Sequence, residues 1–297
     1  MSNTTLIRLL PAILIFILSG CSLDTLNLLA SESVFERTAD IAYGPDLRQR
    51  LDIYKPVAAS SRTPVVVFFY GGGWHNGNKN SFLYVASALT KRGLVTVIPD
   101  YRLYPNIKFP AFVQDGAAAV AWVQQHIADY GGDPDHIVVM GHSAGAHIAA
   151  LLALDERYLR ALAARPVQGM IGLSGPYDFL PFSHVEMNDI FGPAERYPES
   201  QPINFVDVKD PPLLLLHGGR DTLVSPSNTL NLANRVNARG GCVESVIYPR
   251  LDHVTLLVRL SPWLLKPDIL NRVENFAKAP GCKNHESITV TQGSGDH

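Results

Sequence analysis

The sequence GHSAG at residues 141–145 has the residue types and spacing of a nucleophile on a sharp turn. It follows the apolar run HIVVM and precedes an Ala- and Leu-rich segment, which predicts a strand, a tight turn and a helix in that order. Such a turn would hold the Ser143 hydroxyl exposed, while its two glycines let neighbouring chain segments approach. The pattern alone is weakly specific, and its position after a buried strand strengthens it.

A serine hydroxyl needs a base that accepts its proton, most often a histidine oriented by a carboxylate. With this kind of turn the chain order is nucleophile, acid, histidine. Asp221 follows the predicted strand PLLLLHG, and His253 follows the predicted strand VESVIY. Ligands of parallel sheets bind at the carboxyl ends of the strands. We therefore predict Ser143, Asp221 and His253 as a catalytic triad.

Other acids and histidines fit these roles less well. Asp252 adjoins His253, and neighbours in sequence rarely orient each other's side chains. The ring of His142 is expected to point away from the serine hydroxyl, and His217 is expected to be a hydrogen-bonded structural residue at a strand end. The remaining candidates are assigned to packing or to the surface: His75, His147 and His184. No His/Cys/Asp cluster has zinc-ligand spacing, so neither a metal nor another cofactor is implied.

Three consecutive glycines end another predicted strand. In VVVFFYGGGW, residues 65–74, apolar and aromatic residues run directly into Gly71. Glycine loses the most conformational freedom on folding, so this run needs a reason. When a serine attacks a carbonyl, bare backbone N–H groups stabilise the oxyanion that forms. We predict an oxyanion hole made by the amides of Gly72, Gly73 and Ala144, the residue after the nucleophile.

A parallel sheet is needed to bring these strand ends to one edge. From about residue 36, short apolar runs alternate with helical patterns, which predicts βαβ units. The interior runs are nearly continuous in apolar residues, as in strands covered on both faces. The expected strands are 50–56, 65–70, 94–102, 136–140, 170–174, 212–218 and 243–248, and the expected helical segments are 109–130, 144–164 and 227–241.

Length and composition limit the classes of protein to which this chain can belong. With 297 residues, of which 46% are hydrophobic and 18% charged, the chain can bury the core of one large α/β domain. The formal net charge of −2 predicts no basic surface for nucleic acid. The sequence leaves the oligomeric state open.

Residues 1–20 are predicted to be a signal peptide outside the fold. Arg8 precedes an apolar run that is shorter than the roughly 20 residues that span a bilayer. The next letters, LSGC at 18–21, resemble the lipobox of bacterial lipoproteins, which implies lipidation of Cys21 and anchoring in the cell envelope. By the same resemblance, Ser22 in place of Asp implies the outer membrane, facing the periplasm. A short membrane anchor is the alternative.

The three cysteines agree with export. Processing at Cys21 would leave Cys242 and Cys282 as an even pair in a compartment that permits disulfides. A bond between them and two unpaired thiols both stay open, because the sequence does not supply the distance between their Cα atoms.

Together these motifs resemble α/β-hydrolases of the hormone-sensitive-lipase and kynurenine-formamidase type. They cover about residues 50–256 and read LDIYKP, YGGGW, PDYRLYP, GHSAG, HGGRDTLV and DHVTLL. The resemblance implies an α/β-hydrolase fold with a mostly parallel sheet of about eight strands and helices on both faces. It also implies a serine carboxylesterase that forms an acyl-enzyme from a small or medium acyl or aryl ester. Tyr70 replaces the family's usual histidine, which puts the fine shape of the glycine loop in question.

The expected organisation is a signal peptide, a tether, a catalytic domain with a small cap and a polar tail. These cover residues 1–20, 21–35, 36–280 with the cap at about 176–208, and 281–297. Several aromatic and histidine side chains could line a substrate pocket, with packing of the cap as the alternative. They are Trp74, His75, Phe179, Phe182 and Phe191.

Three other functions stay open. The glycine loop also permits hydrolysis of aryl formamides. A serine peptidase of related fold usually adds a propeller or a large lid, for which we expect no room in this chain. A non-catalytic binding module built on an esterase scaffold generally loses the serine or the histidine, and this chain has both. Carboxylic-ester hydrolysis is therefore the predicted function.

Overall fold

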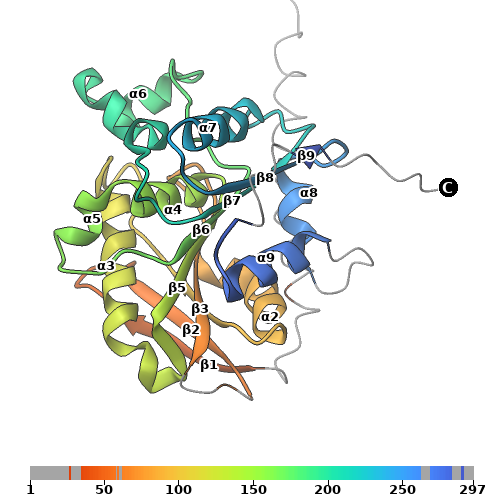
Figure 1. Ribbon diagram of the computed structural model, residues 1–297. Coiled ribbons are helices and arrows are strands. Elements are labelled where there is room, and N and C mark those ends of the chain that lie inside the picture. Colours follow the sequence, from red (N-terminus) through yellow and green to blue (C-terminus); the bar gives the residue numbers. More distant parts are fainter. Residues whose placement is uncertain are drawn as a thin grey trace, which may run out of the picture.

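A single twisted sheet runs through the molecule. The computed structural model describes residue 27 and residues 35–57, 59, 62–261, 268–282 and 289–290. Within these residues the sheet has nine strands in the order β1-β2-β4-β3-β5-β6-β7-β8-β9 (Figure 1). The strands are β1 (Phe35–Ala42), β2 (Arg50–Pro56), β3 (Thr63–Phe69), β4 (Val95–Pro99), β5 (Gly132–His142), β6 (Gly169–Leu173), β7 (Leu213–Gly218), β8 (Val243–Tyr248) and β9 (Thr289–Val290).

The sheet is parallel except at its N-terminal edge. β2 pairs antiparallel with both β1 and β4, and the pairs from β4 through to β9 are parallel. β4, β6 and β7 are buried along their whole length, which explains their unbroken apolar runs. The carboxyl ends of β3, β5 and β7 therefore meet at one edge. This topology confirms the predicted α/β-hydrolase fold.

Helices cover both faces of the sheet. Figure 1 shows α3, α4 and α5 on one side, and α2 and α9 on the other. α7 packs on β7 and β8, and α8 packs on β7. The helices are α2 (Leu83–Lys91), α3 (Ala111–His126), α4 (Ala144–Leu154), α5 (Glu156–Arg160), α6 (Val185–Phe191), α7 (Ser227–Ala238), α8 (His253–Val258) and α9 (Asp268–Lys278).

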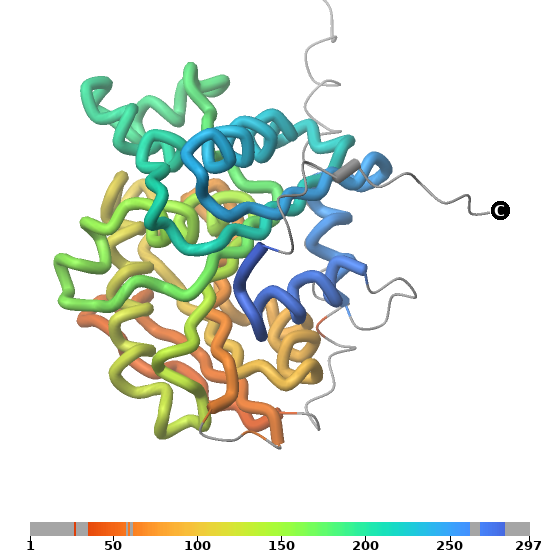
Figure 2. The backbone as a smooth tube through the Cα atoms, viewed as in Figure 1, coloured from red at the N-terminus to blue at the C-terminus, as the bar shows by residue number. Residues whose placement is uncertain are grey.

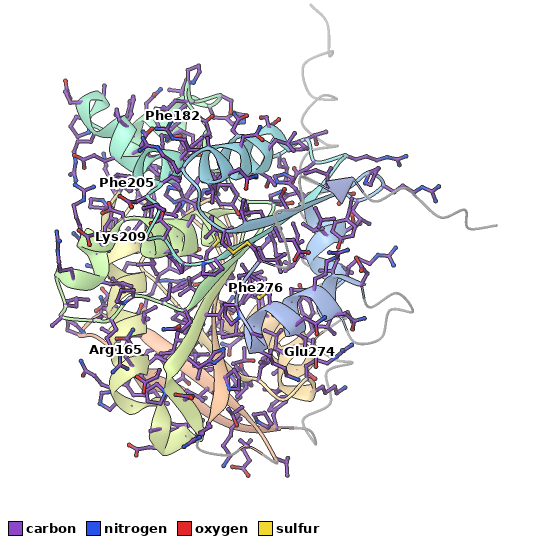
Figure 3. The ribbon with its side chains drawn as sticks, viewed as in Figure 1. Arg165, Phe182, Phe205, Lys209, Glu274 and Phe276 are labelled. Atoms are coloured by element: carbon purple, nitrogen blue, oxygen red, sulfur yellow. A yellow bond between two sulfur atoms is a disulfide. The ribbon has the colours of Figure 1, made fainter. Side chains whose placement is uncertain are left out.

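The pattern of α9 shows how sequence fixes a helix face. Its buried side chains recur at helical spacing and form one apolar stripe: Ile269, Leu270, Val273, Phe276 and Ala277. Phe276 lies against Gly169 at the start of β6, where a Cβ on the glycine would come within 2.9 Å of the ring. On the other side of the helix, the Glu274 carboxylate accepts a hydrogen bond from Arg92, which follows α2 (Figure 3). These contacts hold α9 against both the sheet and α2.

A small cap stands between β6 and β7. It contains α6 and two short 3-10 helices, η4 (Ala194–Ser200) and η5 (Pro202–Phe205), and the tube view shows it as a separate lobe beyond the strand ends (Figure 2). The Asp189 carboxylate of α6 accepts hydrogen bonds from Tyr104 and Lys108, which attach the cap to the loop after β4. The expected cap segment therefore carries short helices, one α-helical and two 3-10.

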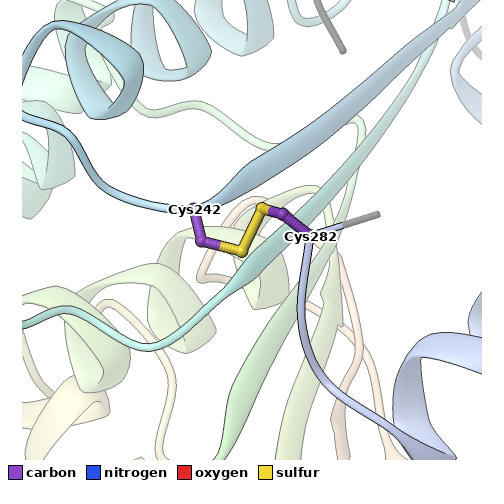
Figure 4. The surroundings of a disulfide bond; sticks show 2 residues. All are labelled: Cys242 and Cys282. Carbon is purple, nitrogen blue, oxygen red and sulfur yellow. A yellow bond between two sulfur atoms is a disulfide. The ribbon is translucent and has the colours of Figure 1, made fainter. Parts of the chain in front are cut away.

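A disulfide joins the start of β8 to the residues after α9. Cys242 and Cys282 are bonded with their Cα atoms 5.7 Å apart (Figure 4). Beyond it, β9 pairs with β8, so the segment at 281–297 is not only the polar tail that we expected. The physical reason is that β8 would otherwise present unpaired N–H and C=O groups at a sheet edge, and β-branched residues suit a covering strand.

The expected signal peptide, residues 1–20, and the expected lipidation site, Cys21, lie outside the described residues. Within the part of the chain that the structure describes, no helix combines the length and the apolar character needed to cross a membrane. Asn27, which is described, contacts Asn80 and Tyr84 and so places the chain beside the start of α2.

Candidate active site

Ser143 stands on a sharp turn between β5 and α4. Its φ of 54° and ψ of −124° are outside the conformations that L-residues prefer, as a nucleophile elbow requires. The two flanking glycines permit this turn. A Cβ on Gly141 would lie 2.2 Å from the Gly145 oxygen, and a Cβ on Gly145 would lie 2.0 Å from the Phe69 oxygen. The G-x-S-x-G pattern thus reflects two backbone contacts that leave no space for a side chain.

The expected acid and base meet beside this turn. His253, the first residue of α8, places its Nδ1 2.7 Å from Asp221 Oδ2. Asp221 follows β7, and its other oxygen accepts the backbone amides of Leu223 and Val224 at 3.0 and 2.9 Å. The carboxylate is therefore fixed by its own loop on one side and holds the imidazole on the other. Ser143 Oγ makes no hydrogen bond to a described residue, and such bonds often tighten only when substrate is bound.

The carboxylate of Asp221 stays ionised. Burial would raise its pKa, but hydrogen bonds from the His217 and His253 rings, together with the charge of His253, hold that pKa well below its usual value. His217 Nε2 lies 3.2 Å from Asp221 Oδ2 and 2.9 Å from the Val224 oxygen. His217 is hydrogen-bonded, as expected for a structural residue, and it also touches the predicted acid.

Asp252 has a different role from Asp221. Its side chain accepts the amides of Val254 and Thr255 at 3.1 and 2.8 Å, and Thr255 Oγ1 accepts the Asp252 amide at 2.8 Å. This reciprocal arrangement is a capping box at the start of α8. Asp252 therefore caps the helix that carries His253, whereas Asp221 contacts the imidazole.

The glycine loop lies against the nucleophile. A Cβ on Gly71 would come within 2.9 Å of Ser143 Cβ, so the loop and the elbow are in contact. Gly72 and Gly73 have φ values of 142° and 61°, which side chains disfavour. Among the described residues, no acceptor is bonded to the amides of Gly72, Gly73 or Ala144. These three N–H groups are the predicted oxyanion donors.

Tyr70 fixes the base of the loop. Its hydroxyl donates to Asp100 Oδ1 at 2.6 Å and accepts from Arg48 at 2.9 Å, and its carbonyl accepts the Tyr101 hydroxyl at 2.8 Å. The ring stacks on Phe82 and Tyr101. Burial raises the pKa of Tyr70 well above its ordinary value, so the hydroxyl stays protonated and donates. Where the family resemblance leads us to expect a histidine, this chain has a buried aromatic clamp.

The proposed pocket residues fall into three environments. Trp74 and Phe191 are buried, with 4% and 0% of their surface exposed, and their rings pack edge to face. Phe191 therefore packs the cap in this structure. Phe179 and Phe182 are half-buried, and Phe182 lies in the cap in Figure 3. His75 is exposed, with its Nδ1 2.9 Å from the Gly73 oxygen.

His147, which the sequence led us to assign to packing or the surface, is a packing residue at the centre of this aromatic group. It is fully buried in contact with Trp74, Phe179 and Phe191, and its Nε2 donates to the Ser200 oxygen at 2.7 Å. Burial lowers the pKa of His147 to about 4, so the ring is neutral. Its position one helical turn after Ser143 was the signal that could have placed it near the site.

The chain is similar in sequence to proteins named as esterases. The BD-FAE family matches the chain over residues 51–236. Esterase LipQ of Mycobacterium tuberculosis is 34% identical over 70% of this chain and 55% of its own length. A probable isoprenylcysteine alpha-carbonyl methylesterase of Arabidopsis thaliana is 28% identical over 74% of this chain and 51% of its own length. The chain thus spans about half the length of these curated relatives.

Solved structures show the same fold. A truncated carbohydrate esterase from gut microbiota superposes with a TM-score of 0.72 at 21% identity, over 84% of this chain and 97% of that one. Esterase B from Lactobacillus rhamnosis superposes with a TM-score of 0.73 at 19% identity, over 91% of this chain and 94% of its own. At these identities the similarity supports the fold.

Proposed function

The chain belongs to the BD-FAE family, and from this membership and the geometry of the site we propose that it is a serine carboxylic-ester hydrolase. The observation that carries the proposal is the 2.7 Å contact between His253 and Asp221 beside a strained serine whose neighbouring amides are unpaired within the described chain. The relatives named as esterases support the same reaction.

The residues divide the reaction between them. Ser143 Oγ attacks the ester carbonyl while His253 Nε2 accepts its proton, and Asp221 holds Nδ1–H and stabilises the imidazolium. The amides of Gly72, Gly73 and Ala144 donate to the oxyanion. His253 then protonates the leaving alcohol, which leaves an acyl-enzyme. Water, deprotonated by the same histidine, releases the acid and restores the serine.

A labelling experiment tests this mechanism. A fluorophosphonate probe should modify wild-type protein on Ser143, and Ser143→Ala should take up none. Ser143→Ala and His253→Ala should each lower kcat by about 10⁴–10⁶. If the wild-type protein neither reacts with the probe nor hydrolyses any nitrophenyl ester, the proposed function is wrong.

The substrate class that we propose is a small or medium acyl or aryl ester. Half-buried Phe179 stacks on the buried Trp74 next to the glycine loop, and half-buried Phe182 packs on Phe179, which supports an apolar group beside the scissile carbonyl. Nitrophenyl esters of increasing acyl length, assayed with an aryl formamide beside them, test this class. A higher kcat/KM for the formamide than for every ester would instead make the protein a formamide hydrolase, as in the kynurenine-formamidase type.

We also propose that the enzyme is exported and lipid-anchored at Cys21 in the cell envelope, with the outer membrane as its destination. The support is the order of Arg8, the apolar run and LSGC in the sequence. Cys21→Ser should release the enzyme from the membrane fraction or block its processing. Unchanged size together with unchanged membrane attachment would show that residues 1–20 act as a plain anchor.

A further inference from the structure

His142 is a second buried histidine in contact with the proposed base. Its Nε2 lies 3.0 Å from the main-chain oxygen of His253, and the two ring centroids are 4.7 Å apart with the planes tilted by 49°. A carbonyl oxygen only accepts hydrogen bonds, so the proton must be on Nε2 of His142. The bond ties the end of β5 to the start of α8.

The other side of the His142 ring faces the glycine loop. A Cβ on Gly71 would lie 3.0 Å from His142 Nδ1, and this same Cβ would lie 2.9 Å from Ser143 Cβ. The imidazole is therefore wedged between the proposed oxyanion loop and the proposed base. It is also the residue directly before the nucleophile, so its position and that of Ser143 are coupled through one peptide bond.

The ring carries no charge at neutral pH. Burial, and then the charge of His253, lower the pKa of His142 to about 3. The other titratable groups around this pair are Asp221 and His217, at and after the end of β7, and Asp252, which precedes His253. His142 therefore contributes a neutral donor and a flat surface, and leaves Asp221 as the counter-ion of the base.

We propose that His142 is a positioning residue. By holding the main chain of His253, it sets the distance between the His253 ring and the Ser143 hydroxyl. The inference rests on the proposed function, because it concerns how the base reaches the nucleophile. Asp221 fixes the rotation of the imidazole through Nδ1, but it does not fix the distance from α8 to β5. The hydrogen bond from His142 spans that gap. A displacement of about 1 Å between reacting groups can cost about 10²-fold in rate.

Three substitutions separate positioning from mere packing. His142→Leu keeps an apolar body but removes the donor, and should lower kcat about 10- to 100-fold while KM changes less than about twofold. His142→Gln can still donate to the same carbonyl and should recover most of the loss. His142→Asp places an anion beside the base and should move the acid limb of the kcat/KM profile upward by about one pH unit.

His136 supplies a matched control on the same strand. It lies near the start of β5, and its Nε2 donates to the main-chain oxygen of Ala277 at 2.8 Å. His136→Leu removes the same kind of hydrogen bond, between β5 and a C-terminal helix, at the end of the strand away from the site. It should lower the melting temperature, and leave kcat per folded molecule and the pH profile unchanged.

The outcomes distinguish this inference from the proposed function. The positioning role is wrong if His142→Leu loses no more activity than His136→Leu, if Gln recovers nothing, or if Asp leaves the pH profile in place while wild-type protein is labelled at Ser143. If the wild-type protein is neither labelled nor active, the proposed function fails. An NMR titration of the His253 ring signals then still tests the contact with residue 142. His142→Asp should raise the pH at which these signals titrate, and His136→Leu should leave that pH unchanged.

Discussion

At Gly72 and Gly73, the missing side chains keep two amides accessible beside the nucleophile, but the two positions differ in what a methyl group would meet. On Gly72 a Cβ would lie 2.1 Å from the Asn76 oxygen, which is backbone and cannot move without shifting the loop. On Gly73 it would lie 2.8 Å from the ring of His75, an exposed side chain that can turn away by giving up its 2.9 Å contact with the Gly73 oxygen. Space therefore makes Gly72 the more sensitive of the two.

We expect Gly72→Ala to lower kcat by about 10²–10³, the loss that follows removal of one oxyanion donor. Gly73→Ala should cost less, because its positive φ and a side chain that can move oppose the methyl group, whereas at Gly72 the obstacle is backbone. Steady-state kinetics on a short nitrophenyl ester measures both, with circular dichroism and melting temperature as controls. Activity lost only in proportion to lost folded protein would mean that the loop is a structural turn.

At the scale of the element, the capping box of α8 determines where His253 begins its helix. Asp252→Ala removes the side-chain acceptor for Val254 and Thr255, and should cost about 0.5–2 kcal/mol of unfolding free energy. Because Asp252 does not contact the imidazole, kcat should change far less than in Asp221→Asn, which we expect to lower it by about 10⁴. Urea unfolding and kinetics of both variants give the comparison. A larger kinetic loss from Asp252→Ala than from Asp221→Asn would overturn our choice of acid.

The residues around α8 show which features of the site could be predicted from the sequence and which could not. Asp221 and His253 were predictable because strand ends and chain order locate them without knowledge of side-chain contacts. The hydrogen bond from His142 to the His253 main chain was not predictable, because it joins residues 111 positions apart. We expected the His142 ring simply to point away from the serine hydroxyl. Periodicity locates an element and its buried face, and it does not encode which distant carbonyl a ring will reach.

Some strands could likewise be predicted from the sequence, and others could not. Long apolar runs such as the four leucines of β7 were predictable, since burial on both faces leaves the strand no exposed position. β9 was not, because two β-branched residues in a polar segment carry almost no signal until β8 offers them an edge.

For the whole molecule, two buried neutral histidines predict a loss of stability in acid. The pKa values of His142 and His147 are lowered by burial to about 3 and about 4. The unfolded chain takes up protons on these rings below about pH 6.5 and the folded chain does not, so the free energy of unfolding falls as the pH drops from about 6.5 towards 4. Each ring should account for about 2 kcal/mol at pH 5. Asp221, whose folded pKa is depressed, adds a further loss only below about pH 4.

Urea unfolding at pH 7.5 and pH 5 measures this effect. His147→Gln keeps a donor for the Ser200 oxygen and removes the titrating ring, so its stability should fall less between the two pH values than that of the wild type. An identical fall in wild type and variant would show that His147 is protonated in the folded protein.

The disulfide gives a second prediction for the whole molecule. Cys242 and Cys282 are 40 residues apart, and closing a loop of that length stabilises the folded state by about 4 kcal/mol in the chain-entropy estimate. The double substitution Cys242→Ser, Cys282→Ser should lower the urea midpoint accordingly. The same midpoint in reduced and oxidised wild-type protein would contradict this expectation.

The disulfide also determines how a proteolytic cut between Cys242 and Cys282 would be detected. Arg250 is exposed in the turn between β8 and α8, and cleavage after it by trypsin would separate His253 from β8. Cys242 lies on one side of that cut and Cys282 on the other, so the two fragments stay covalently joined. A nicked enzyme would migrate as one band on a denaturing gel without reductant and as two with it. In the nicked enzyme, the bond from His142 would still hold the main chain of His253, and Asp221 would still hold its ring. The disulfide would keep the fragment attached, so activity would change while the molecule still appeared intact.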